Sequence, residues 1–424
     1  MNQAITDEQI DLLIDAKLVH EIHTSERRSF RACRRRWDWA FNEAYYPNVT
    51  AKPLEFGVAY HEAMEIYYDP AWWDTDREVR AALAIKKFVD TCEAQRKAAL
   101  ESHVNLTYDD DVEMDYDERV ELGKGMLSFY FNEVAPVEDK GWRPVKVEVG
   151  FMILIPNPET GESVIWCKCD NCQTKINTYR DTMKGKEECI PPALRLILGG
   201  LDALPVVYAG RLDMLAEDLT HKGNYYIFDW KTARAIPDNH DFLYLDDQVA
   251  SYVWALSELG LNVRGFVYHE QRKGFPSAPK KNKQRRLGCL FSVAKNQDTD
   301  YDKYLATVKA EDREAYEEGA YDEFLEYLKT YGVKYFERTK IVKAKSELAQ
   351  IAENIGYEAL DMIDQSLRIY PSPGRFGCQF CAFQTPCIEK NSGGDWEYTL
   401  DSLFERREHY YLRKDASTES KSGE

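Results

Sequence analysis

The 424-residue sequence has no apolar run long enough to cross a membrane. The longest candidate, Leu194 to Gly210, is interrupted by Arg195 and Asp202, whereas a spanning helix needs about 20 consecutive, mostly apolar residues. The first ten residues also lack the basic and then apolar pattern of a secretion signal. We therefore expect neither a membrane protein nor a secreted one. The ten cysteines should then meet a reducing compartment, where clustered thiols bind metal more often than they form disulfides.

The sequence has fewer basic than acidic residues: 55 Lys and Arg against 73 Asp and Glu, which gives a net charge of −18. This excludes a protein that coats nucleic acid with its whole surface, but it leaves room for a local basic groove. The sequence shows no repeat of solenoid length and no long low-complexity tract, which excludes fibrous and repeat architectures. Hydrophobic residues make up 44% and aromatic residues 13%, enough for one large domain or two to three smaller ones.

Hydrophobic periodicity separates helical from extended parts of the chain. Helical patterns cover 1–69, 76–134 and 300–369. Residues rich in β-branched and aromatic side chains predict strands at 145–155, 205–215, 224–231, 263–270 and 287–295. A helix is predicted from Asp246 to Leu259, with Gly260 as its C-terminal cap. This order of elements predicts an α/β core with a helical annex.

The changes of pattern divide the chain into five segments. They are a helical segment with the first core strand at 1–155, a cysteine-bearing insertion at 156–204, a core hairpin with helix and strands at 205–299, a helical annex with further cysteines at 300–412, and a tail at 413–424. We expect the tail to be disordered, because it is a chain terminus made almost entirely of polar residues.

Two acidic residues lie inside apolar strands that a polar turn connects. The turn from Asp218 to Gly223 has its midpoint near residue 220.5, so antiparallel pairing places residues opposite one another when their numbers sum to about 441. The numbers of Asp213 and Asp229 sum to 442, so we expect them across the hairpin, with Lys231 on the same face as Asp229. These groups suit a divalent cation and an activated water. A surface salt bridge is the alternative, which the apolar surroundings disfavour.

Two helical motifs place polar side chains on one helix face. His61 and Glu65 are four residues apart, and so are Gln248 and Tyr252 in the helix that follows the acidic strand. Either pair also suits an ordinary amphipathic helix. If they serve the acidic hairpin, Gln248 and Tyr252 would position a phosphate or a metal-bound water.

Together these motifs resemble the RecB-like branch of the PD-(D/E)XK nuclease superfamily over about residues 25 to 390. They are H, G-x-x-D, D-x-K and Q-x-x-x-Y, in that order: His61, Gly210 to Asp213, Asp229 to Lys231, and Gln248 with Tyr252. The resemblance implies a restriction-endonuclease-like core, which is a mixed central sheet flanked by helices.

The same resemblance assigns roles to residues of this site. It implies that Mg²⁺ or Mn²⁺ is held by His61, Asp213, Asp229 and the backbone carbonyl of Trp230. The catalytic residues would be Asp213 and Asp229 with Lys231 as the catalytic lysine, supported by Gln248 and Tyr252. Glu148, on the preceding strand, is a weaker candidate for an outer-sphere role, and a solvated strand acid is an equal alternative.

Four cysteines carry a second resemblance. Cys33 near the N-terminus and C-x-x-C-x-x-x-x-x-C at Cys378, Cys381 and Cys387 resemble the ligands of the iron–sulfur nucleases in this superfamily. These are the CRISPR-associated Cas-four-type exonucleases, AddB subunits of helicase–nucleases and phage-encoded relatives. The resemblance implies a [4Fe–4S] cluster that would pin distant parts of the chain together. Zinc is the alternative, because C-x-x-C alone also binds zinc.

The other cysteines fall outside that pattern. The insertion contains four within a short stretch, which predict a structural Zn²⁺ site, with a partial or chance cluster as the alternative: Cys167, Cys169, Cys172 and Cys189. We expect the remaining two, Cys92 and Cys289, to be buried apolar residues.

Two basic stretches offer a path for DNA phosphates. One is an arginine-rich run around Cys33 and the other is the predicted loop at 272–286, and their candidate DNA-binding residues are Arg34, Arg35, Arg36, Lys280, Lys281, Lys283, Arg285 and Arg286. A charge run is usually a solvated face, but both runs flank elements of the predicted site, so we expect them to border one DNA groove. Trp37, Trp39 and Tyr45 could stack on unpaired bases or belong to the core.

The resemblance therefore implies a metal-dependent DNA exonuclease with a structural iron–sulfur cluster, acting in recombination, repair or phage DNA processing. Its location would be the cytoplasm of a bacterium or phage-infected cell, and its substrate DNA ends, single-stranded or frayed. The alternative is a non-cleaving or partner-dependent DNA-end-binding subunit of a recombination or CRISPR-adaptation complex. The sequence has no G-x-x-x-x-G-K-[ST] loop, so a helicase partner would be another chain.

Overall fold

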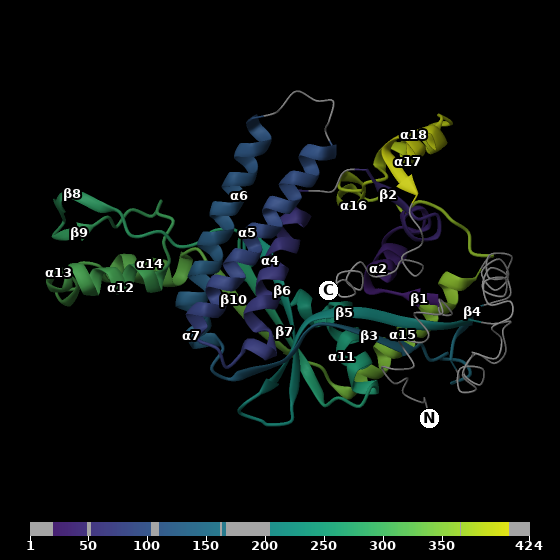
Figure 1. The fold of residues 1–424 in the computed structure, drawn as a ribbon, viewed down its shortest axis with the longest axis horizontal. Helices are drawn as coiled ribbons and strands as arrows, with labels where there is room; N and C mark the ends of the chain where they lie inside the picture. Colours follow the sequence, from purple (N-terminus) through teal and green to yellow (C-terminus); the bar gives the residue numbers. More distant parts are fainter. Residues whose placement is uncertain are drawn as a thin grey trace, which may run out of the picture.

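The computed structural model describes residues 20–48, 52–102, 110–161, 163–166, 204–364 and 366–406. At its centre lies a mixed β-sheet with helices on both faces, and a helical lobe extends from one side (Figure 1). The predicted α/β fold, a mixed central sheet flanked by helices, is confirmed. None of the helices in these ranges has the length and apolar character needed to span a membrane.

The central sheet has seven strands within the described ranges. They are β1 (His20–Ile22), β3 (Trp142–Leu154), β4 (Ile165–Trp166), β5 (Leu204–Asp218), β6 (Tyr225–Ala233), β7 (Val263–Arg272) and β10 (Phe336–Val342). The order is β1-β5-β6-β7-β10, with β3 and β4 also paired to β5. The β1–β5 and β6–β7 pairs are parallel. The pairs β3–β5, β4–β5, β5–β6 and β7–β10 are antiparallel.

The core hairpin of β5 and β6 has the predicted register. Met214 pairs with Phe228 and Leu215 with Ile227, so paired numbers sum to 442. In the connecting turn, the Asp218 carboxylate accepts the backbone N–H of Thr220 at 2.9 Å. Gly223 has φ +83°, a conformation that glycine adopts without steric cost. Turn chemistry and strand pattern therefore agree on one register.

One face of the sheet is covered by helices from the first third of the chain. These are α4 (Lys52–Tyr68), α5 (Arg77–Ser102) and α6 (Asp110–Phe129), with the 3-10 helix η2 (Pro70–Trp72), the π-helix η3 (Tyr130–Val134) and α7 (Ala135–Glu138). On α4, Tyr60, Met64 and Tyr67 are fully buried and belong to the same core as Phe228 and Trp230. Their helical spacing turns one stripe of α4 onto the sheet.

The opposite face packs against α2 (Thr24–Ala32), α11 (Asp247–Glu258) and α15 (Lys345–Ile363), with the short α10 (Phe242–Leu245) before α11. The Asp246 carboxylate accepts the backbone N–H of Gln248 at 2.7 Å and so caps α11. After the helix, Gly260 has φ +86° and its N–H bonds to the Ser257 carbonyl at 3.0 Å. The helix predicted between Asp246 and Leu259 is thus confirmed, together with its glycine cap.

The lobe contains α12 (Tyr301–Glu311), α13 (Arg313–Glu317), α14 (Asp322–Tyr331), β8 (Lys281–Arg286) and β9 (Cys289–Phe291). Its hydrophobic core is separate from those of the sheet and includes Phe291, Tyr304, Tyr321 and Leu328. Cys289 belongs to this core and Cys92 to the core under α4, each only 1% exposed. The prediction that both cysteines are buried is confirmed.

Segments far apart in the sequence meet in what we call the cysteine unit. Its N-terminal part is α3 (Arg34–Trp37), the π-helix η1 (Asp38–Asn42) and β2 (Tyr45–Pro47); its C-terminal part is α16 (Arg375–Gln379), α17 (Gln384–Ser392), α18 (Trp396–Leu403) and β11 (Phe404–Arg406). β2 and β11 pair antiparallel. Trp39 and Tyr45 pack there with Phe383 and Phe404. Trp37 is buried in the sheet core, so for these aromatic residues the core alternative is correct.

Three secondary-structure predictions are wrong. The stretch 300–369, predicted to be helical, contains β10, and the predicted loop 272–286 contains β8. The predicted helical stretch 1–69 also contains β1 and β2. Both β8 and β10 are rich in charged residues, and most of their side chains are at least partly exposed. Strands of this kind lack the apolar pattern by which a buried strand is found. The cysteines predicted to bind zinc, and the tail 413–424, lie outside the described residues.

Candidate active site

The hairpin brings Asp213 and Asp229 to the same place. The β5–β6 pairing ends at Met214 and Phe228, and Asp213 and Asp229 are the next residues of the two strands beyond that pair. The backbone N–H of Trp230 donates to Asp213 Oδ2 at 2.7 Å, so the carboxylate is fixed against the neighbouring strand. The Trp230 side chain is fully buried beneath α4. Its backbone carbonyl as a metal ligand stays a prediction.

His61 reaches this hairpin from α4. Its Nδ1 lies 3.4 Å from Asp213 Oδ1. The preceding Tyr60 fixes the helix, because its hydroxyl donates to Gln271 Oε1 on β7 at 2.8 Å. Burial lowers the pKa of His61, but the hydrogen bond to Asp213 and the charge of that carboxylate outweigh burial and raise it. A histidine nitrogen and a carboxylate oxygen thus face each other, as two ligands of one cation would.

Glu148 is the third member of this group. The register Val147–Met214 and Val149–Leu212 places it across from Asp213, and it has φ +48°, an uncommon conformation for a residue other than glycine. Ligand atoms of His61, Glu148 and Asp213 all lie within 4.8 Å of one another. The structure therefore places Glu148 directly beside the predicted ligands His61 and Asp213. The β3–β5 register is the signal that could have shown this, but no local pattern in the sequence determines that register.

Burial and the charges in this group shift the pKa of Glu148. Burial, followed by the negative charges of Asp213 and Glu65, raises the pKa of Glu148 to about 7. Burial alone would raise the pKa of Asp213, but the hydrogen bond and charge of His61 outweigh it and lower that pKa. Glu65, the partner of His61 in the predicted helical motif, therefore acts on this site through its charge.

Asp229 and Lys231 form the adjoining pair. Lys231 Nζ lies 2.6 Å from Asp229 Oδ2, and Gln248 Nε2 donates to Asp229 Oδ1 at 3.4 Å. Burial lowers the pKa of Lys231, but the charges of Asp229 and Asp213 outweigh it and raise that pKa. Burial raises the pKa of Asp229, against the opposing charge of Lys231. The D-x-K motif therefore presents a lysine cation held by a carboxylate that Gln248 also contacts.

Tyr252 supports the site through packing. Its ring lies 5.0 Å from that of Phe151, edge to face, and it is only 8% exposed. A methyl group at Gly210 would come within 2.5 Å of the Phe151 ring and 3.1 Å of Tyr252. The glycine of G-x-x-D thus allows the tyrosine of Q-x-x-x-Y to pack against β5, which holds α11 and Gln248 over Asp229.

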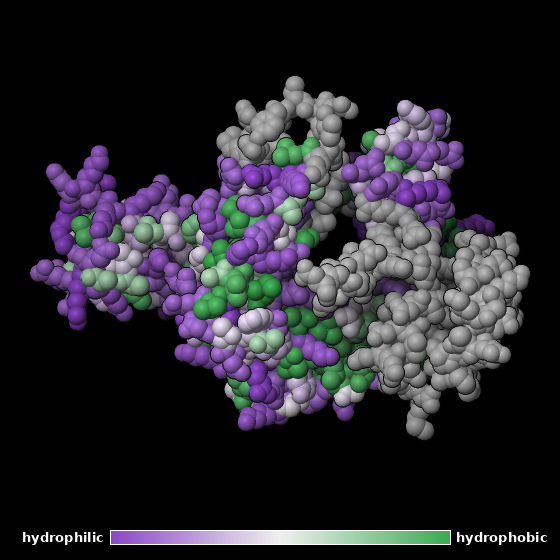
Figure 2. Space-filling view, viewed as in Figure 1, coloured by the Kyte–Doolittle hydropathy of each residue, from purple (hydrophilic) through white to green (hydrophobic). Residues whose placement is uncertain are grey.

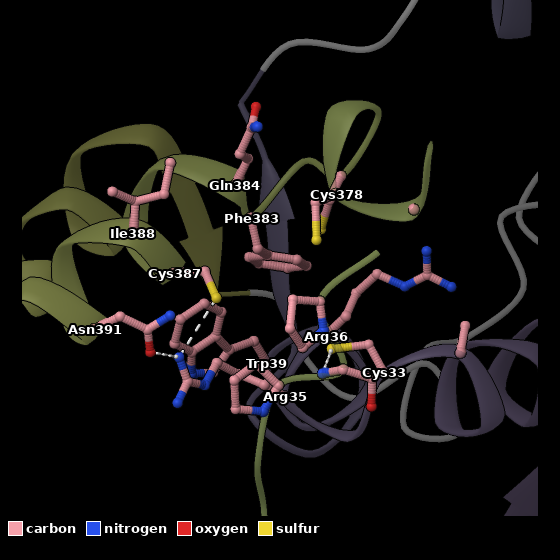
Figure 3. Close-up of a pocket in the computed structure, with 16 residues that line it drawn as sticks. Cys33, Arg35, Arg36, Trp39, Cys378, Phe383, Gln384, Cys387, Ile388 and Asn391 are labelled. Atoms are coloured by element: carbon pink, nitrogen blue, oxygen red, sulfur yellow. Dashed lines mark hydrogen bonds between the residues drawn. The ribbon is translucent and has the colours of Figure 1, made fainter. Parts of the chain in front are cut away.

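The four predicted cluster cysteines line one cavity of about 300 Å³ in the cysteine unit (Figure 3). Cys33 comes from the end of α2, and Cys378, Cys381 and Cys387 come from the C-terminal part. Three sulfurs accept hydrogen bonds at 3.4 Å: Cys33 from the Ser372 N–H, Cys378 from the Gly374 N–H and Cys387 from Arg35 Nη1. All four thiols are free and half-buried. The fold therefore unites the four residues that the sequence separates.

The arginine-rich run contributes mainly to internal contacts. Arg27, Arg28 and Arg31 pair with acids at the start of α11 or on α15. Arg34 lies over the Tyr370 ring at 5.2 Å, and Arg36 Nε donates to Ser29 at 3.1 Å. These contacts join α2 and α3 to the rest of the fold, because each one crosses between elements or neighbouring turns.

The second basic stretch lies elsewhere. The hairpin of β8 and β9 is at the far end of the lobe, while α2 lies on the other side of α4 to α6 (Figure 1). The two stretches that we expected to border one groove are therefore separated in the structure. The reason is that β9 belongs to the core of the lobe and carries the hairpin away from the sheet.

A mixed sheet is flanked by helices, and a histidine, three carboxylates and a lysine gather around its central hairpin; this combination is typical of a nuclease fold. The family model of the PD-(D/E)XK nuclease superfamily matches residues 24–388. The chain belongs to this superfamily, which indicates nuclease activity, DNA as the class of substrate and a divalent metal as cofactor. A comparison with curated proteins gives no match.

Proposed function

We propose that the protein is a divalent-metal-dependent deoxyribonuclease that digests DNA from its ends. The observation that carries the proposal is the group of His61, Glu148 and Asp213, whose ligand atoms lie within 4.8 Å of one another. Beside it stands the pair Asp229 and Lys231, with 2.6 Å between carboxylate and ammonium. A cation site next to a fixed lysine suits phosphodiester hydrolysis by an activated water, because the metal can activate the water and polarise the phosphate.

The donor set fits Mg²⁺ or Mn²⁺. Hard cations prefer carboxylate oxygens and keep several waters, and Glu148 and Asp213 supply such oxygens, with an imidazole nitrogen from His61. Asp229 would complete the set from the adjoining strand. When bound, the ion would act as a Lewis acid toward the scissile phosphate and the attacking water.

The neighbouring residues have separable roles. Lys231 is cationic in this site because its pKa is raised, so it acts as a hydrogen-bond donor and a positive charge toward the phosphate or the water. Asp229 orients the ammonium, and Gln248 orients Asp229. Because these groups are already in position, their contribution costs little reorganisation during the reaction.

We further propose that the cysteine unit holds a [4Fe–4S] cluster. Four thiols around one cavity match the ligand number of such clusters, and N–H donors to ligand sulfurs are a usual part of their surroundings. The cluster would have a structural role, joining the part of the chain that contains Cys33 to the part that contains Cys378. Iron and sulfide analysis of protein purified without oxygen tests this; stoichiometric zinc in place of iron would contradict it.

The nuclease proposal is tested with end-labelled linear DNA, single- and double-stranded, in Mg²⁺ or Mn²⁺ and with EDTA as the metal-free control. Metal-dependent loss of label is expected, while a covalently closed circle should remain intact. Lys231→Ala should abolish cleavage. Lys222→Ala, which removes an exposed lysine in the turn of the same hairpin, should not. Equal cleavage by wild type and Lys231→Ala would refute the site, and cleavage of the circle would refute the requirement for an end.

An inactive wild-type protein with its cluster intact would favour the other function, a DNA-end-binding subunit that cuts only with a partner. That outcome is recognised by DNA binding without cleavage. The Asp213→Ala variant separates the two functions when cleavage and DNA binding are both measured: in a nuclease it abolishes the cleavage that the wild-type protein shows, whereas in a non-cleaving subunit it leaves DNA binding unchanged.

A further inference from the structure

The hairpin of β8 and β9 carries a concentration of positive charge that the nuclease site does not use. From Arg272 to Gln297 the sequence has no Asp or Glu, in a chain with a net charge of −18. It has eight cationic residues there: Arg272, Lys273, Lys280, Lys281, Lys283, Arg285, Arg286 and Lys295. The end of the lobe that bears the hairpin is mostly hydrophilic on its visible face (Figure 2). Positive charge that is concentrated on one short stretch of an acidic protein indicates an anionic partner.

Two of these cations fix the hairpin to the lobe. Lys281 Nζ lies 2.6 Å from Glu311 Oε2, and Arg285 Nη2 lies 2.5 Å from Asp312 Oδ1. The Asp312 carboxylate also accepts the backbone N–H of Leu290 at 2.8 Å. Because Phe291 at the base and Cys289 beside the turn are both buried in the lobe core, the hairpin is anchored along its length and presents its turn in a defined direction.

Other cations of the hairpin have no such structural role. Lys283 and Arg286 are exposed, and neither forms an ion pair with any residue that the structure describes. Unpaired cations held on a rigid element suit contacts to backbone phosphates, which bind without regard to sequence.

The tip of the hairpin is unusual in its chemistry. Arg286 pairs with Cys289, which leaves Leu287 and Gly288 as a two-residue turn with φ +54° and +80°. Such turns favour Asn-Gly, because both residues must adopt a left-handed conformation that is strained for a bulky side chain. Leu287 is nevertheless 82% exposed. Neither backbone preference nor packing accounts for a leucine here, so its apolar side chain is available to a partner.

We propose that this hairpin is a second DNA contact that binds the minor groove of duplex DNA. Lys283 and Arg286 bind phosphates at the edges of the groove, and Leu287 contacts base edges inside it. The minor groove is about 6 Å wide, too narrow for a whole two-stranded ribbon, so only the exposed side chain of the turn enters it, as the apolar side chains of minor-groove-binding proteins do. The hairpin's aromatic residue, Phe291, is buried and cannot stack on unpaired bases.

The inference rests on the proposed function only in that DNA is the partner, because the hairpin needs neither the metal site nor cleavage. It is therefore tested in EDTA, by fluorescence anisotropy with the full-length protein. The probe is a dumbbell duplex closed by loops at both ends, so that end binding is not measured. An absence of nuclease activity in the wild-type protein would contradict the proposed function and leave this measurement valid.

The charge contact is tested with the double variant Lys283→Ala/Arg286→Ala. The dependence of log affinity on log salt should become shallower by about two, one for each lost phosphate contact. The control Lys309→Ala/Lys329→Ala removes the same charge from exposed positions on helices of the lobe and should keep the wild-type slope. A slope equal to that of the control would overturn the proposal.

The groove contact is tested with Leu287→Gly. Glycine relieves the left-handed strain, so thermal stability should be unchanged or higher, while affinity for the dumbbell duplex falls several-fold. Netropsin, which occupies the minor groove, should compete with the wild-type protein. Unchanged affinity of Leu287→Gly, or no competition by netropsin, would overturn the placement of Leu287 in the groove. A larger loss of affinity of Leu287→Gly for a single-stranded probe than for the duplex would overturn the choice of partner.

Discussion

Glu148 lies across β3 and β5 from Asp213, in a backbone conformation with φ +48°. The two acidic side chains are thereby turned toward one point, where His61 also arrives. Repulsion between them is part of what raises the pKa of Glu148 to about 7. A cation at this point would relieve that repulsion, so the arrangement is stable in the form in which the proposed enzyme works.

The first prediction concerns Glu148 as a metal ligand. Glu148→Gln keeps the size of the side chain and removes its charge, so Mn²⁺ affinity should fall by at least about tenfold. Cleavage at saturating metal should recover only in part. Isothermal titration calorimetry with Mn²⁺ measures the affinity. Glu159→Gln, at an exposed position shortly after β3, is the matched control, and equal affinities in both variants would remove Glu148 from the ligand set.

The second prediction concerns the packing at Gly210. In Gly210→Ala the added methyl group meets the Phe151 ring at 2.5 Å, and we expect a loss of about 1–3 kcal/mol in the free energy of unfolding. Urea denaturation measures it. Adding Phe151→Leu, which makes room for the methyl group, should restore part of the loss. If the double variant is less stable than either single one, the clash is not the cause.

A third prediction addresses the buried ion pair between β10 and the segment after α7. Arg338 Nη2 donates to Asp139 Oδ1 at 2.8 Å and to the Tyr130 hydroxyl at 2.6 Å. Arg338→Met leaves the Asp139 carboxylate without its cation, which should cost about 3–5 kcal/mol. Arg338→Met/Asp139→Asn should be more stable than Arg338→Met alone. Chemical denaturation compares the variants, and an additive double variant would show that the charges do not interact.

The fourth prediction is a pH dependence of stability in the lobe. Burial would raise the pKa of Asp312, but hydrogen bonds from Tyr321, the Leu290 N–H and Arg285 outweigh it and lower that pKa. A carboxyl group whose pKa is lower when folded stabilises the protein above its unfolded pKa of about 4, and this stability is lost as pH falls below that value. Asp312→Asn should therefore be less stable at neutral pH and lose less on acidification.

Urea unfolding followed at neutral pH and again near pH 3 to 4 tests this prediction. Asp322→Asn changes an exposed acid of the same lobe and serves as the control. The same pH dependence in both variants would show that Asp312 is not the group responsible.

The sequence predicted the part of the fold whose signals are local. The turn from Asp218 to Gly223 and the apolar strands on either side determined the hairpin register to within one unit, and the structure has Met214 paired with Phe228. The strand β10 was missed because its residues Phe336–Val342 are largely charged, and its place in the sheet depends on pairing with β7, a contact between distant parts of the sequence.

The same holds for the candidate site: the residues that one local motif brings together were predicted, and those that depend on distant contacts were not. Asp213, Asp229 and Lys231 follow from one hairpin, so spacing alone brings them together. Glu148 required the register of a third strand, and the separation of the two basic stretches required knowing that β9 is buried in the lobe core. Periodicity did not supply relations between elements, since those depend on packing; the expectations that His61 meets the hairpin and that Cys33 meets the C-terminal cysteines came from the family resemblance.

The pairing of β2 with β11 also has a consequence for the integrity of the protein. This pairing holds together the two ends of the long stretch of chain that lies between β2 and β11, and Trp39 and Phe404 belong to the same small core. A single proteolytic cut within that loop, for example in the turn at Gly223, would therefore open the chain without releasing a fragment. The cut protein should migrate as one species under native conditions and as two under denaturing conditions.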